Sequence, residues 1–270
     1  MKHFLRVGLV AIWIGFVSDL ALAERSQDLI ELARSKTSER FEFALEHDAK
    51  IIPTPDRRSF FLLWKPDVGA PEQYLVTLHG HGSWATDDFY VWYPFLKDRK
   101  IGLIAIQWWF GGGEETKDYY DPKSLYQQIA LVLKNENVNS GQAILHGFSR
   151  GSANSYAVAY EDRKSGNNYF GYVISNSGGM MSDYPPNRAI EQDPDAGNIY
   201  SEIQWIFFCG AQDPNPNRDG CIAMRKASEW VVRHGAQELL FIEDPNGSHG
   251  GFHRNPENAE KALNAMQPKG

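Results

Sequence analysis

Short apolar runs alternate with amphipathic segments along most of the chain. Runs rich in Val, Ile, Leu and aromatic residues predict buried strands at Ser59–Lys65, Tyr74–Leu78, Ile101–Ile106, Gln142–His146, Gly171–Ser175, Ile203–Cys209 and Glu238–Ile242. Apolar residues at helical spacing predict helices at Ser26–Arg34, Asp87–Asp98, Pro122–Lys134, Ser152–Tyr160, Ile222–Arg233 and Pro256–Met266. Strands that alternate with helices predict an α/β fold, with a mainly parallel sheet covered by helices on both faces.

The segment Gly147–Gly151 joins a predicted strand to a predicted helix and reads Gly-Phe-Ser-Arg-Gly. A Ser between two Gly on a strand-to-helix turn is the pattern of a nucleophile elbow. Such a turn is sharp and strained, so the residues two positions on either side of the Ser must be nearly without side chains. Ser149 is therefore the candidate catalytic nucleophile.

A nucleophilic Ser needs a His to take its proton and a carboxylate to orient that His. Asp213 and His249 each follow a predicted strand, which places them where open α/β sheets bind ligands. We therefore expect Asp213 as the orienting acid and His249 as the base. His253 is the alternative base. The alternative acids are Asp219, Glu243 and Asp244.

The predicted strand Tyr74–Leu78 runs into a Gly-rich turn, His-Gly-His-Gly. Small residues there allow backbone N–H groups to face a developing oxyanion, and each such donor contributes ~3–4 kcal/mol to catalysis. We expect the N–H groups of His81 and Arg150 to form this oxyanion hole. His79 and His81 also form an H-x-H pair that could bind a metal. Because no acidic residue follows in that turn before Asp87, and a Ser/Asp/His set lies elsewhere, we expect no metal and no other cofactor.

These motifs, in the order nucleophile, acid, base, resemble those of the α/β-hydrolase superfamily, and the resemblance covers most of the chain. The family's oxyanion, nucleophile, acid and base positions fall on Leu78–Gly82, Gly147–Gly151, Asp213 and His249. The form without a large cap domain is similar to secreted esterases of the feruloyl esterase and polyhydroxyalkanoate depolymerase type. The resemblance implies an α/β-hydrolase fold and a serine hydrolase that cleaves carboxylic esters through an acyl-enzyme. His81 departs from many relatives, which carry a small residue or Cys at that position.

Aromatic residues gather where the strand Ile101–Ile106 ends. Trp108 and Trp109, with Tyr119–Tyr120 shortly after, are expected on the rim of the active site, where flat surfaces suit sugar rings or aromatic acyl groups. Half-buried packing residues are the alternative reading. The connection Met180–Tyr200 is longer than most loops and lies where this fold often inserts a lid. The expected substrate is a small-molecule or polymer-linked ester; a serine peptidase or amidase and a non-catalytic binding protein are the alternatives.

The first 23 residues predict a secretory signal peptide. Lys2 and Arg6 precede an apolar run, Val7–Val17, that is too short to span a membrane, and Ala21–Ala23 provides a cleavage site. We therefore expect a single mature domain over residues 24–270 that is secreted or periplasmic and does not insert into a membrane. With 42% hydrophobic residues and a net charge of −7, the chain has the composition of a globular enzyme and not of a nucleic-acid-binding protein.

The chain contains two cysteines, Cys209 and Cys221, which flank the candidate acid Asp213. In an oxidising compartment a disulfide between them would clamp the loop that carries Asp213. Two free buried thiols are the alternative. The sequence predicts no oligomeric state.

Overall fold

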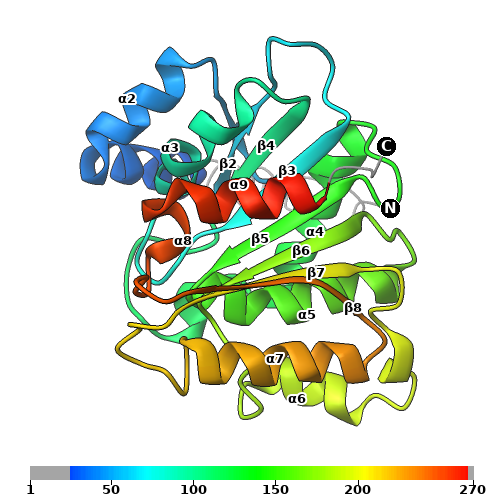
Figure 1. Cartoon of the computed structure of the whole chain (residues 1–270). Coiled ribbons are helices and arrows are strands. Elements are labelled where there is room, and N and C mark those ends of the chain that lie inside the picture. Colours follow the sequence, from blue (N-terminus) through cyan, green and yellow to red (C-terminus); the bar gives the residue numbers. More distant parts are fainter. Residues whose placement is uncertain (1–24, 267–270) are drawn as a thin grey trace, which may run out of the picture.

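The computed structural model describes residues 25–266, and the predicted signal peptide lies outside them. Eight strands form one sheet through the middle of the molecule, in the order β1-β2-β4-β3-β5-β6-β7-β8 (Figure 1). The strands are β1 (Lys50–Pro53), β2 (Phe60–Trp64), β3 (Gln73–Leu78), β4 (Ile101–Ile106), β5 (Ala143–Phe148), β6 (Phe170–Asn176), β7 (Gln204–Gly210) and β8 (Gln237–Asp244). Strand β2 runs antiparallel to β1 and β4, and all other neighbours pair in parallel. The predicted, mainly parallel sheet is confirmed.

Helices cover both faces of the sheet, as predicted (Figure 1). One face carries α4 (Pro122–Asn135), α5 (Arg150–Ser165), α6 (Pro185–Gln192) and α7 (Cys221–Arg233). The other face carries a helix over residues 25–36 together with α2 (Ser38–Glu46), α3 (Ala85–Leu96), α8 (Gly251–Arg254) and α9 (Pro256–Ala265). Two short 3-10 helices, η1 (Thr116–Asp118) and η2 (Ala196–Asn198), lie in connections.

Successive side chains along each central strand point alternately into two hydrophobic cores, one on each face of the sheet. The core that includes α3 receives three fully buried residues in register across β3, β4 and β5: Leu75, Leu103 and Ile144. The core that includes α5 receives the next residue of each strand: Val76, Ile104 and Leu145. Burial of each such side chain stabilises the fold by roughly 1.5–3 kcal/mol. Burial on both faces explains why these strands are continuous apolar runs in the sequence.

Several elements were not predicted, among them β1, α2, α6 and α8. Strand β1 is a short edge strand with exposed ends, and α2 precedes it. The connection Met180–Tyr200 contains the short helices α6 and η2. Within the described residues it forms no large cap domain. None of the helices between residues 25 and 266 is long and apolar enough to cross a membrane.

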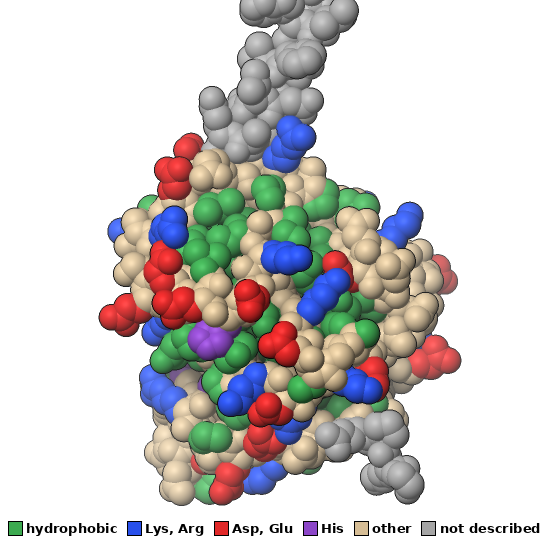
Figure 2. Space-filling view, turned by 90° about the horizontal axis from the view of Figure 1, so that it is seen from above, with side chains coloured by type: hydrophobic (Ala, Val, Ile, Leu, Met, Phe, Trp, Pro, Cys, Tyr) green, Lys and Arg blue, Asp and Glu red, His purple; other side chains and the backbone are tan. Residues whose placement is uncertain are grey.

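Charged side chains of both signs are interspersed on the face seen in Figure 2, with hydrophobic side chains grouped between them. Exposed ion pairs include Arg34–Glu42 and Lys100–Glu72. Because solvent and salt screen such pairs, each contributes roughly 0–1 kcal/mol to stability. The two cores and the sheet therefore hold the site in place, and the surface charges contribute little.

Candidate active site

The predicted elbow lies at the carboxyl end of the central strand β5. Ser149 joins β5 to α5 with φ 54° and ψ −115°, a strained backbone conformation for a residue with a side chain. A Cβ atom on Gly147 would lie 2.5 Å from the carbonyl oxygen of Gly151, and one on Gly151 would lie 2.0 Å from that of Leu78. Both positions therefore require glycine, which is the physical reason for the Gly-x-Ser-x-Gly spacing.

The structure brings Ser149, His249 and Asp213 into one hydrogen-bonded chain. The Ser149 Oγ lies 2.8 Å from Nε2 of His249, and Nδ1 of His249 lies 2.7 Å from Oδ2 of Asp213. The Asp213 side chain is 1% exposed and that of His249 is 32% exposed. The other Asp213 oxygen accepts the backbone N–H of Asn215 at 2.8 Å. With Nδ1–H donating to Asp213, Nε2 is free to accept the Ser149 proton.

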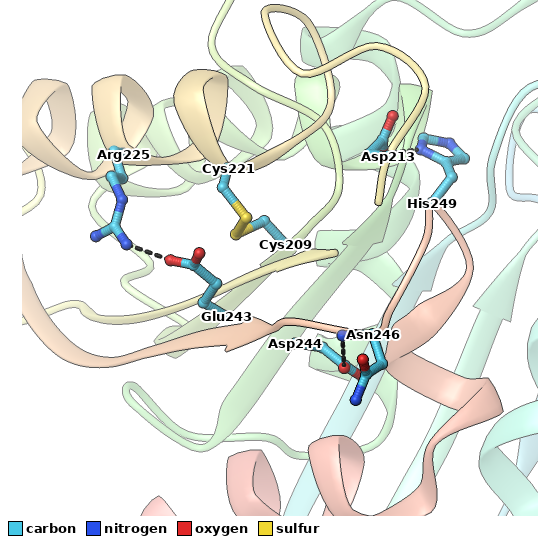
Figure 3. The surroundings of a disulfide bond; sticks show 8 residues. All are labelled: Cys209, Asp213, Cys221, Arg225, Glu243, Asp244, Asn246 and His249. Atoms are coloured by element: carbon cyan, nitrogen blue, oxygen red, sulfur yellow. Dashed lines mark hydrogen bonds and ion pairs between the residues drawn. A yellow bond between two sulfur atoms is a disulfide. The ribbon is translucent and has the colours of Figure 1, made fainter. Parts of the chain in front are cut away.

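A disulfide joins Cys209 in β7 to Cys221 at the start of α7, with Cα atoms 5.0 Å apart. The predicted bridge is confirmed. Figure 3 shows Asp213 and His249 side by side, Asp213 on the β7–α7 connection and His249 beyond the end of β8. The disulfide closes the β7–α7 connection, so it limits the movement of the segment that carries Asp213.

The alternative base, His253, lies in α8 and packs away from Ser149. Its ring centroid is 5.0 Å from that of Trp92 and 5.4 Å from that of His146. Part of the residue reaches the surface, but its Nε2 nitrogen is buried and has no hydrogen-bond partner in the described part of the chain. Burial lowers the pKa of His253 to about 3, so the ring is neutral at ordinary pH.

The alternative acids have other partners. Glu243 pairs with Arg225 (Figure 3). Asp244 accepts hydrogen bonds from the side chains of Asn255 and Asn258 in the C-terminal segment. Asp219 is buried and pairs with Arg218 at 2.7 Å, although its carboxylate lies within 4.8 Å of Asp213 and His249 ligand atoms. Both ring nitrogens of His249 are already hydrogen-bonded, to Ser149 and Asp213.

The turn after β3 lies against the nucleophile. A Cβ atom on Gly80 would lie 3.5 Å from the Cβ of Ser149, and His81 lines the same cavity as Ser149. Arg150 is the first residue of α5, so its backbone N–H has no partner within the helix. The two residues predicted for the oxyanion hole, His81 and Arg150, therefore both line the cavity that contains Ser149.

The two histidines of the H-x-H pair have different surroundings. His79 is fully buried, and burial lowers its pKa to about 4. His81 is exposed, with Nδ1 3.0 Å from the Tyr119 hydroxyl and Nε2 3.6 Å from the Glu114 carboxylate. His79 Nδ1 instead contacts the carbonyl oxygen of Gly80 at 2.9 Å.

Two adjoining cavities open at the site. The first has a volume of about 460 Å³ and contains Ser149, with His81, Arg218 and Asp219 in its wall. The second, of about 340 Å³, has four aromatic residues in its wall and is called the aromatic cavity below: Trp108, Tyr119, Tyr120 and Tyr184. The two cavities share Arg150, Ala153 and Met181.

The two tryptophans predicted to bind substrate differ in position. Trp108 lines the aromatic cavity but is only 2% exposed, and its Nε1–H donates to the carbonyl oxygen of His79. Trp109 lines neither cavity: its ring packs on Trp84, and its Nε1–H donates to the carbonyl oxygen of Gly113.

The sequence analysis did not identify the segment after β6, which lies close to the elbow. A Cβ atom on Gly178 would lie 2.0 Å from the carbonyl oxygen of Ser149, and Ser177 has φ 52°. The signal was Gly178, three residues beyond the end of the predicted strand Gly171–Ser175. Glycine at this position allows the chain to pass close to the nucleophile.

No protein-family model and no curated protein sequence matches the chain. Solved structures match at low identity. Acyl-protein thioesterase 2 from Zea mays is 18% identical, with TM-score 0.53, and the match covers 76% of this chain and 97% of that one. Esterase PE8 is 16% identical, with TM-score 0.59, covering 81% of this chain and 100% of that one. An esterase from Pyrobaculum calidifontis is 13% identical, with TM-score 0.59, covering 95% of this chain and 97% of that one.

The chain therefore has the α/β-hydrolase fold, and this prediction is confirmed. Fold does not by itself fix a reaction, so the activity must be argued from the site.

Proposed function

We propose that the protein is a serine hydrolase that cleaves carboxylic esters, with Ser149 as nucleophile, His249 as base and Asp213 as orienting acid. The observation that carries the proposal is the chain of short contacts from Ser149 Oγ through the His249 ring to a buried carboxylate. The similar solved structures named as esterases and a thioesterase support acyl transfer as the reaction class.

The reaction follows from these contacts. Nε2 of His249 takes the Ser149 proton while Oγ attacks the ester carbonyl carbon, and the carbonyl electron pair moves onto oxygen. Backbone N–H groups of His81 and Arg150 stabilise this oxyanion. When the carbonyl re-forms, the alcohol leaves and takes the proton from Nε2, so an acyl group stays on Ser149. Water then repeats the sequence and releases the acid.

Asp213 has an electrostatic role in both steps. Its carboxylate holds the proton on Nδ1 and stabilises the imidazolium that forms when Nε2 is protonated. Its second oxygen accepts the backbone N–H of Asn215. The disulfide closes the β7–α7 connection that carries both residues. The acid is therefore fixed before the substrate arrives.

The substrate class and location are part of the proposal. The aromatic cavity beside Ser149 suits a small-molecule ester or the ester-bearing end of a polymer, as in esterases of the feruloyl esterase and polyhydroxyalkanoate depolymerase type. The leader over residues 1–23 would send the chain out of the cytoplasm, as a secreted or periplasmic enzyme.

A substrate screen tests the proposal. Short p-nitrophenyl esters should be hydrolysed with saturation kinetics, whereas peptide anilides should be cleaved far more slowly. Ser149→Ala should abolish turnover while leaving the circular dichroism spectrum unchanged. Faster cleavage of anilides than of esters would identify an amidase, and turnover that survives Ser149→Ala would contradict the mechanism.

A further inference from the structure

The Arg150 side chain lies in the wall that the two cavities share. Its guanidinium carbon is 3.9 Å from the centre of the Tyr119 ring. Its Nη1 atom donates to His81 Nδ1 at 3.1 Å and to the carbonyl oxygen of Glu114 at 3.0 Å. The side chain is therefore held in place by an aromatic face and two hydrogen-bond acceptors.

No carboxylate of residues 25–266 lies within 4.0 Å of the Arg150 guanidinium. Across the same residues, its Nε and Nη2 atoms have no hydrogen-bond partner. The three acidic residues that line the cavities do not pair with Arg150: Asp219 pairs with Arg218, and the side chains of Glu114 and Asp183 are exposed. Arg150 thus presents a positive charge and free N–H donors to the cavities.

Asn154 lies one helical turn after Arg150 and lines the aromatic cavity. The residue is 2% exposed, and its side-chain oxygen accepts the Tyr184 hydroxyl at 2.9 Å. Its side-chain nitrogen has no partner in the described part of the chain. A buried donor without a partner costs about 1–3 kcal/mol, so a ligand that accepts from it would recover that energy.

Residues four apart on a helix lie on the same face. Arg150 and Asn154 therefore line one cavity with a cationic and a neutral side chain, near the N-terminus of a 16-residue helix whose dipole favours an anion. A guanidinium fork matches the two oxygens of a carboxylate better than any neutral group.

We propose that Arg150 and Asn154 bind a carboxylate on the substrate, so that the protein prefers esters that carry an acid group at the end remote from the scissile bond. The remote end would lie in the aromatic cavity while the ester carbonyl lies at Ser149. This inference rests on the proposed esterase function and adds the substrate class.

The test compares p-nitrophenyl monoesters of glutaric, adipic, pimelic and suberic acids with neutral p-nitrophenyl alkanoates of equal chain length, at pH 8. The ratio of kcat/KM for the acidic and neutral ester is the readout, because a loss in the shared catalytic steps lowers both values. At the best chain length the wild-type ratio should exceed ten, roughly the effect of one charge-assisted hydrogen bond.

Arg150→Gln should lower this ratio at least about tenfold, and Arg150→Lys should retain part of it because the charge remains. Arg34→Gln is the matched control: Arg34 lines neither cavity and its charge is paired with Glu42 at the surface, so the ratio should change by less than about twofold. A wild-type preference for the neutral ester at every length, or an unchanged ratio in Arg150→Gln, would overturn the inference.

Binding separates this inference from the proposed function. The monomethyl esters of the same acids are titrated calorimetrically into Ser149→Ala and Ser149→Ala/Arg150→Gln proteins, which requires no hydrolysis. Binding that is lost with Arg150→Gln supports the carboxylate site even if no ester is cleaved. Equal binding to both proteins, or none to either, rejects the site while leaving the hydrolase mechanism to its own test.

Discussion

Breaking the disulfide between Cys209 and Cys221 should lower stability by an amount that follows from the length of the loop it closes, and it should also slow catalysis. The bridge spans a sequence separation of 12 residues. For a closed loop of that length, the chain-entropy relation gives about 2.8 kcal/mol of stabilisation at 25 °C. With an unfolding entropy of roughly 2.1 cal/mol/K per residue, a domain of this size should lose about 6 °C in Tm.

The test uses Cys221→Ala, because the remaining Cys209 thiol is fully buried and packs as a small apolar side chain. Calorimetry should show the lower Tm, and kcat for a p-nitrophenyl ester should fall because Asp213 no longer fixes the His249 tautomer as firmly. Wild-type protein in a strong reductant should show the same shift, and Cys221→Ala should not respond to the reductant.

Two results would refute this reasoning. The first is alkylation of both thiols in the native, unreduced protein, measured by intact mass. The second is an unchanged Tm after reduction that the same mass measurement shows to be complete.

Three further outcomes are expected. His249→Ala should reduce kcat about as completely as Ser149→Ala does, whereas His253→Ala should retain much of the activity. If steady-state assays show the larger loss of kcat in His253→Ala, then His253 is the base. Gly151→Ala should prevent stable folding, because its Cβ would lie 2.0 Å from the Leu78 carbonyl oxygen. Gly112→Ala is the control: its Cβ would meet nothing within 4 Å, so the variant should unfold at nearly the wild-type Tm. Equal Tm values for the two variants would contradict the elbow geometry. Burial lowers the pKa of His253 to about 3 from its usual 6.5, so the unfolded chain binds a proton more readily and stability is lost as pH falls below 6.5. Denaturant titrations should show the wild-type protein losing up to ~1.4 kcal/mol of unfolding free energy per pH unit relative to His253→Gln. A difference between the two proteins that stays constant with pH would exclude this linkage.

Local patterns predicted much of this fold. Strand β4 was predicted with its observed bounds, because an apolar run of six residues is too short for a buried helix and fits a strand buried on both faces. The elbow was predicted because its Gly-x-Ser-x-Gly pattern lies within five residues of chain, although the clash that requires Gly151 is with Leu78 of the neighbouring strand β3. Edge strand β1 and helix α6 carry weaker patterns, because each buries only part of its surface.

Contacts between distant segments could not be derived from pattern alone. The choice of His249 over His253 depends on how the chain turns after β8, and the choice of Asp213 over Asp219 depends on which carboxylate faces the ring. Likewise, Arg150 was singled out only for its backbone N–H. The stacking of its side chain on Tyr119 requires residues 31 apart in sequence to meet, and no local signal records this contact.

The central claim is that Ser149 is a nucleophile activated by His249 and Asp213. Labelling with a fluorophosphonate, followed by intact-mass measurement and peptide mapping, tests it directly, because the reagent modifies only an activated serine. We predict one phosphonyl group per folded molecule, on the peptide that contains Ser149, with no labelling of Ser149→Ala and strongly slowed labelling of His249→Ala. Absence of labelling in the folded wild-type protein, or equal labelling of Ser149→Ala, would contradict the account.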